Sequence, residues 1–194
     1  MTYPPDFTCP VRKAAVADAA ATCIAGLAAD HRAVVQAGGC SGLWPLALAS
    51  RFAHVYTFEP APSNFQYLAA NVAGVPNVTA FPFALGATAH SVGLTRPKPK
   101  AGLWRVDGDG AVPMRALDAV LDVPIDALVL DVEGSEVPAL AGAARLIATH
   151  RPLLWLEGLE HADAIASWLA AHDYAPLAHG MGGDGYSVHT SRIH

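Results

Sequence analysis

The sequence has few charged residues and no surplus of positive charge. Charged residues make up 15% of its 194 residues, and the formal net charge is −5 at pH 7. A protein that binds a nucleic-acid backbone usually carries the opposite balance. We therefore expect the partner to be a small molecule, a sugar or a protein group, and not DNA or RNA. Hydrophobic residues reach 53%, so the composition also excludes a disordered chain.

Cysteine is scarce, and targeting segments are absent. Cys9, Cys23 and Cys40 form an odd set without metal-ligand spacing, which is typical of a reducing compartment. No basic segment precedes an apolar stretch at the N-terminus, so no signal peptide is predicted. The alanine-rich run at 14–29 is too short to span a bilayer. These features predict a cytoplasmic protein with no membrane segment.

Helical and strand patterns alternate along the chain. Apolar spacing predicts an N-terminal helix over residues 11–30. Short apolar runs predict strands at residues 33–37, 54–59, 78–83, 128–131, 153–157 and 186–190. Single helices are expected from near Ser41, over 137–147 and after 160. A further helix is expected from Ser63, which has capping-box spacing with Gln66. A turn is expected at 182–185. The alternation predicts one α/β domain over residues 1–194, with a mostly parallel sheet and helices on both faces.

Residues 95–113 show no clear period, so a long loop is predicted there. Loops of this length inside a compact domain are usually functional or disordered. Four basic residues surround Trp104 in this stretch: Arg96, Lys98, Lys100 and Arg105. The loop is either a lid that attracts an anionic acceptor and stacks on it, or a solvated segment held by one aromatic side chain.

A glycine-rich turn follows the first predicted strand. Gly38, Gly39 and Gly42 allow the backbone to approach a ligand closely. Their spacing differs from the G-x-G-x-x-G pyrophosphate fingerprint, which favours a nucleoside ligand without phosphates over NAD. Glu59 ends the second strand about 20 residues further on, where a carboxylate is expected to accept hydrogen bonds from a ribose diol.

Together these and later residues resemble the FkbM-type methyltransferases over about residues 33–160. The matching pieces are Gly38 and Gly42, Phe58-Glu59-Pro60, Ala84-Leu85-Gly86, Leu117-Asp118, Asp131-Val132-Glu133-Gly134-Ser135-Glu136, and Arg151-Pro152 leading to Glu157. The resemblance implies a Rossmann-like class I methyltransferase fold, S-adenosylmethionine as methyl donor, and a hydroxyl acceptor on a sugar or small metabolite. The cofactor-binding residues expected on this basis are Gln36, Gly38, Gly39, Gly42, Glu59, Pro60, Ala84 and Leu85.

Three positions depart from the family pattern. The family usually has an acidic residue where this chain has Gln36, often asparagine at Cys40, and often lysine at Val129. The acidic residue normally helps to hold the amino acid end of the cofactor. Gln36 can accept a hydrogen bond but brings no charge. A catalytically inactive cofactor-binding or partner module therefore stays open as an alternative, ahead of a nicotinamide-dependent oxidoreductase.

Carboxylates at strand ends are the candidate catalytic groups. An alcohol needs a positioned base to remove its proton in the transition state. Asp131, Glu133 and Glu157 are predicted to face one cleft, and each can serve as that base. No metal site is predicted, although Asp131 and Glu133 as a pair can also hold a divalent cation. Alternatively, Glu133 and Glu136 only favour the N-terminus of the following helix.

Overall fold

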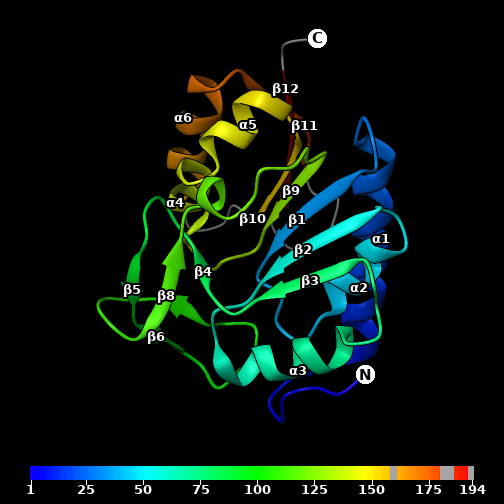
Figure 1. Cartoon of the computed structure of the whole chain (residues 1–194), viewed down its shortest axis with the longest axis vertical. Coiled ribbons are helices and arrows are strands. Elements are labelled where there is room, and N and C mark those ends of the chain that lie inside the picture. Colours follow the sequence, from blue (N-terminus) through cyan, green and yellow to red (C-terminus); the bar gives the residue numbers. More distant parts are fainter. Residues whose placement is uncertain (158–160, 180–185, 192–194) are drawn as a thin grey trace.

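A seven-stranded sheet forms the centre of the molecule (Figure 1). The structure is a computed structural model and describes residues 1–157, 161–179 and 186–191. The strand order is β11-β12-β10-β9-β1-β2-β3, with β12 antiparallel to both neighbours and the other pairs parallel. The bounds are β1 Ala33–Ala37, β2 His54–Phe58, β3 Val78–Phe81, β9 Ala127–Leu130, β10 Leu153–Glu157, β11 Tyr174–His179 and β12 Tyr186–Ser191. The predicted Rossmann-like α/β fold with a mostly parallel sheet is confirmed.

Helices cover both faces of the sheet. The helices are α1 Pro10–Leu27, α2 Leu43–Ala49, α3 Pro62–Val72, α4 Glu136–Ala141, α5 Ala144–His150 and α6 Ala162–Ala171. One hydrophobic core lies against α1 and α2, and the other against α4, α5 and α6, while α3 packs beside β3 (Figure 1). Within the described part of the chain, no helix combines the length and hydrophobicity needed to cross a membrane.

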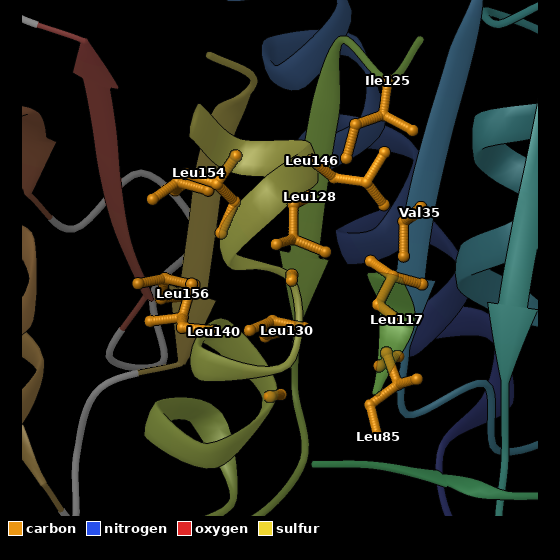
Figure 2. Packing of buried hydrophobic residues seen from close by; sticks show 14 of the residues in the cluster. Val35, Leu85, Leu117, Ile125, Leu128, Leu130, Leu140, Leu146, Leu154 and Leu156 are labelled. Carbon is orange, nitrogen blue, oxygen red and sulfur yellow. The ribbon is translucent and has the colours of Figure 1, made fainter. Parts of the chain in front are cut away.

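Strand β9 contributes side chains to both hydrophobic cores. Its residues are fully buried, and alternate side chains point to opposite faces. Val129 packs toward α1, whereas Leu128 and Leu130 pack toward α4 and α5. Figure 2 shows these two leucines beside Leu140 and Leu146 from the helices. Burying a leucine stabilises the fold by about 1.5–3 kcal/mol, so this double-sided strand anchors the centre of the sheet.

Two predicted helix details are wrong. The capping box of Ser63 and Gln66 does not form; α3 starts with Pro62 in its first turn, and the side chain of Glu59 accepts the Ala61 N–H at 2.8 Å. The single helix expected over 137–147 is divided into α4 and α5. The division falls at Gly142, where an added Cβ would lie 2.0 Å from the Gly86 carbonyl oxygen. The close approach of two loops thus interrupts the helical pattern.

The loop predicted over 95–113 is present for most of its length, at residues 96–104 and 107–111, but short strands interrupt it. Short strands pair locally there: β6 Leu94–Thr95 with β7 Arg105–Val106, and β8 Val112–Arg115 between β4 Ala84–Leu85 and β5 His90–Val92. A 3-10 turn, Leu117–Ala119, follows them. Strands of two to four residues are too short to show a period in the sequence. The last predicted strand is present as β12, its turn at 182–185 lies outside the described residues, and β11, with a bulge after Pro176, was not predicted.

Gly38 tests how strictly the sheet requires glycine at the end of β1. Its φ is +90°, and an added Cβ would lie 1.9 Å from the Asp131 backbone oxygen. We expect Gly38→Ala to lower the free energy of unfolding by at least about 2 kcal/mol in denaturant titration. Gly74→Ala is the control because no atom lies within 4 Å of its added Cβ, and its change should stay within about 0.5 kcal/mol. Equal losses in the two variants would contradict this account.

Candidate active site

The site lies where the strand order reverses. From β1 the chain continues to β2 and β3 on one side, and β9 and β10 lie on the other. Ligands of open α/β sheets bind beyond the carboxyl ends of the strands at such a point. Backbone bonds fix the strand ends: Gly38 and Gly39 donate to the Phe58 carbonyl at 2.9 and 3.0 Å, and Asp131 donates to the Ala37 carbonyl at 3.1 Å.

A cavity of about 520 Å³ opens at this point. Small-molecule sites occupy about 300–1,000 Å³, so the volume suits a cofactor with part of an acceptor. Most of the predicted site residues line it: Gly38, Gly39, Glu59, Pro60, Ala84, Leu85, Asp131, Glu133 and Glu157. The structure thus brings together residues that lie up to 119 positions apart in the sequence, from Gly38 to Glu157.

Glu59 is buried at the end of β2 and holds two backbone segments. One carboxylate oxygen accepts the Cys40 N–H at 2.7 Å and the other accepts the Ala61 N–H at 2.8 Å. Burial raises the pKa of Glu59 to about 7, opposed by these hydrogen bonds and by one from Asn64. These three hydrogen bonds use three of the about four lone-pair sites of the carboxylate, so one site remains for a ligand.

Two predicted cofactor residues do not line the cavity. Gln36 is fully buried, accepts the Thr57 hydroxyl at 2.6 Å and donates to the Ala37 carbonyl at 3.1 Å. Gly42 precedes α2 with φ of 96° and packs near Leu68. Their expected contact with a cofactor is therefore not reproduced by the geometry: Gln36 links β1 to β2, and Gly42 shapes the turn into α2.

Asp131, Glu133 and Glu157 lie close together on the cavity wall. One carboxylate oxygen from each residue lies within 4.8 Å of the others. Burial, followed by the charge and hydrogen bond of Asp131, raises the pKa of Glu157 to about 9. Glu157 therefore keeps its proton near neutral pH.

The loop after β9 fixes where these carboxylates point. Glu133 has φ of 52° and Gly134 has φ of 99°, a sharp turn at the cavity edge. Glu136 is buried, and its side chain accepts the Val132 and Gly134 N–H groups at 3.2 and 3.3 Å. The two acidic residues thus divide the roles that the sequence left open: Glu136 stabilises the turn, and Glu133 faces the cavity and lies 3.6 Å from Arg105.

The β6–β7 hairpin forms one wall of the cavity and is tied down. Asn64 donates to the Ala101 carbonyl at 2.8 Å, and Arg96 forms an ion pair with Asp6. Arg96 also lies over the Trp104 ring, 5.0 Å from its centroid. Trp104 and Lys100 line the cavity, whereas Lys98 is exposed outside it. This wall joins the N-terminal segment to α3.

Other lining residues were missed by the sequence analysis. Phe7, Lys13 and Val16 come from the N-terminal segment and α1. Their helical spacing predicted only a helix that packs on the sheet, because a pattern does not reveal where a helix begins relative to a cavity. Ser41 also lines the cavity. Only 1% of its surface is exposed, and its hydroxyl has no hydrogen-bond partner. His161 occupies the N-cap position of α6 without a side-chain capping hydrogen bond and is not among the lining residues.

Comparison with known families decides what this site belongs to. A model of the methyltransferase FkbM domain matches residues 36–176. The chain belongs to the FkbM methyltransferase family. The resemblance inferred from short motifs is thereby confirmed, and with it the classification as a methyltransferase. No curated protein sequence matches the chain.

Solved structures agree with the fold of this FkbM methyltransferase. An FkbM methyltransferase from Methylobacillus flagellatus KT is 20% identical with a TM-score of 0.61; the match covers 85% of this chain and 45% of that protein. A ribosomal protein L11 methylase from Lactobacillus delbrueckii subsp. bulgaricus is 13% identical, with a TM-score of 0.58 and coverages of 98% and 83%. An rRNA methylase from Streptococcus thermophilus is 15% identical, with a TM-score of 0.54 and coverages of 88% and 91%. The names of these proteins differ in acceptor, so the fold alone does not set the acceptor class.

The raised pKa of Glu157 gives the stability of the methyltransferase a pH dependence. The native state retains a proton that the unfolded chain releases between the ordinary pKa of 4.5 and about 9. The free energy of unfolding therefore falls as the pH rises through this window. We expect Glu157→Gln to reduce this fall, measured as the difference in Tm between pH 5 and pH 9. Asp109→Asn, which removes an exposed carboxylate, should keep the wild-type difference. A Glu157→Gln profile parallel to wild type would contradict the assignment.

Proposed function

We propose that this FkbM methyltransferase transfers the methyl group of S-adenosylmethionine to a hydroxyl of a sugar or small metabolite. The observation that carries the proposal is the arrangement of carboxylates in one cavity. Glu59 lies at one strand end, and the cluster of Asp131, Glu133 and Glu157 lies across the β1 turn. Methyl transfer to a neutral alcohol requires a group that holds the nucleoside of the donor and a base near the acceptor hydroxyl. Glu59 and the carboxylate cluster can supply these two groups from opposite sides of the β1 turn.

The cavity suits a nucleoside with an amino acid side chain. Glu59 offers its remaining lone pair to a ribose hydroxyl, and the apolar lining by Phe58, Phe83 and Leu85 suits an adenine ring. The unpartnered hydroxyl of Ser41 is one further polar group that a ligand can satisfy. The carboxylates of the cluster favour the ammonium and sulfonium charges of the donor by Coulomb attraction.

Asp131 is the proposed base. S-adenosylmethionine supplies, when bound, a methyl carbon whose bond to sulfur breaks as the acceptor oxygen bonds to it, and the electron pair remains on sulfur. Asp131 accepts the proton that leaves the acceptor hydroxyl. Glu157, protonated and hydrogen-bonded to Asp131, holds that carboxylate in place. The turn at Glu133 and Gly134 keeps the base at the cavity edge.

A hydroxyl-bearing small acceptor is supported by charge and shape. The net charge is −5, and the N-terminal segment and the β6–β7 hairpin contribute to the cavity walls. The alternative of an inactive module was motivated by Gln36. Because Gln36 is bonded to Thr57 and does not line the cavity, its missing charge gives no reason to expect loss of catalysis.

Glu59 provides the test of donor binding. We expect Glu59→Gln to weaken S-adenosylmethionine binding by about 1.5–3 kcal/mol, because hydrogen bonds to a charged group contribute this much. Isothermal titration calorimetry at pH 8, where the carboxylate is mainly ionised, measures the change. Asp109→Asn removes an exposed carboxylate outside the cavity and should bind like wild type. Unchanged affinity in folded Glu59→Gln protein would remove Glu59 from the donor site.

Asp131 provides the test of the chemistry. A screen of hydroxylated sugars and metabolites with methyl-labelled donor identifies an acceptor first. With that acceptor, Asp131→Asn should lower kcat and kcat/KM together by about a hundredfold or more and leave donor affinity nearly intact. Weaker donor binding with preserved kcat would instead make Asp131 a cofactor ligand. A wild-type protein that binds donor and methylates nothing in a broad screen would favour the inactive module.

A further inference from the structure

We propose that Lys13, in the first turn of α1, binds the carboxylate of the donor's amino acid end. The inference rests on the proposed function, because it assigns one more residue to the same donor. It goes beyond the family pattern, since Lys13 precedes the matched residues 36–176. The N-terminal helix would then belong to the donor site as well as to the hydrophobic core.

The first turn of α1 is placed at the cavity. The chain turns at Cys9, whose φ is 53°, and α1 starts at Pro10. Lys13 and Val16 line the cavity from successive turns, while Ala17, Ala20 and Ile24 further along are buried against the sheet. Packing of the apolar part of the helix therefore fixes where its polar first turn lies.

The Lys13 side chain is held without a carboxylate partner. Its ammonium lies 4.1 Å from the centroid of the Phe7 ring, which restricts the side chain to the cavity wall. Burial lowers the pKa of Lys13, and so does the like charge of Lys100, while Cys40 and Asp131 oppose this shift. Among the residues that the structure describes, no Asp or Glu forms an ion pair with Lys13. A half-buried cation of this kind gains from an anionic ligand.

The charges of the cavity match those of an amino acid in a defined direction. Glu59 is placed to hold the ribose, and the β1 turn runs from Glu59 toward Asp131. The amino acid end of the donor would then extend along this turn. Its ammonium would face the carboxylate cluster, and its carboxylate would face the ammonium of Lys13, which interacts with Cys40 and Asp131.

Lys13 is distinguished from the other cations of the cavity by burial. Arg12 and Lys100 also line it, but both are exposed, whereas Lys13 is half-buried. An interaction with an exposed cation is weakened by solvent and salt. We therefore assign the donor carboxylate to Lys13 and not to Arg12 or Lys100.

Two nucleosides distinguish binding of the donor's carboxylate by Lys13 from a general structural role of Lys13 in the cavity. S-adenosylhomocysteine carries the amino acid end, and methylthioadenosine keeps the adenosine and sulfur without it. Calorimetry with both ligands is performed on wild type, Lys13→Met and Lys13→Arg. Lys98→Met is the matched control, because Lys98 is an exposed lysine outside the cavity. Methionine and lysine have similar helix propensities, so Lys13→Met should fold, which thermal unfolding without ligand checks.

We expect Lys13→Met to weaken S-adenosylhomocysteine about tenfold and to leave methylthioadenosine within about twofold. Lys13→Arg should keep most of the affinity, and Lys98→Met should match wild type for both ligands. Unchanged S-adenosylhomocysteine affinity in Lys13→Met overturns the inference, and so does an equal loss for both nucleosides. If Lys13→Met alone behaves as wild type while Glu59→Gln loses both ligands, the inference fails and the proposed function stands. If wild type binds neither nucleoside, the proposed function and the inference fail together.

Discussion

The site depends on the close contact between the ends of β1 and β9. Gly38 has no side chain, so its Cα can approach the Asp131 carbonyl, and the Asp131 N–H reaches the Ala37 carbonyl at 3.1 Å. This contact joins the two strands at the point where the chain order reverses. It sets the depth of the cavity between the β1 turn and the carboxylate cluster. A bulkier residue at position 38 would move Asp131 relative to Glu59, and the two ends of the site would lose their spacing.

Burial disfavours the ionised form of the carboxylates in the cavity, and the structure compensates for this in two ways. Backbone N–H groups of Cys40 and Ala61 stabilise the ionised form of Glu59, which burial opposes. Glu157 instead retains its proton, and its side chain is hydrogen-bonded to Asp131. Raised carboxyl pKa values in one cavity are typical of functional sites. The same electrostatics attract a donor that carries positive charge, so one arrangement serves both binding and chemistry.

The elements that position the site were largely predictable from sequence, and the walls of the cavity were not. Strands 33–37 and 153–157 have the predicted bounds because continuous apolar runs are buried on both faces of the sheet. Glu59 and Asp131 follow from their place at strand ends. Gln36 lies outside the lining residues because alternation along β1 directs its side chain toward Thr57, and a sequence motif does not specify that direction. The β6–β7 hairpin was missed because its strands are held by pairing and by Asn64 and Asp6, contacts between residues distant in sequence.

Those long-range contacts bear on how acceptor choice is encoded. The strand ends supply the parts that every donor-dependent step needs, whereas the acceptor meets the segments that complete the cavity. Two such segments are joined here: Asp6 of the N-terminal segment pairs with Arg96 of the hairpin, and Arg96 packs on Trp104. The hairpin also reaches the catalytic cluster through Arg105 and Glu133 at 3.6 Å. A change in the N-terminal segment can therefore alter the β6–β7 hairpin and the carboxylate cluster through a short chain of contacts. The walls of the cavity are consequently held by contacts that lie outside the strand-end motifs of the family.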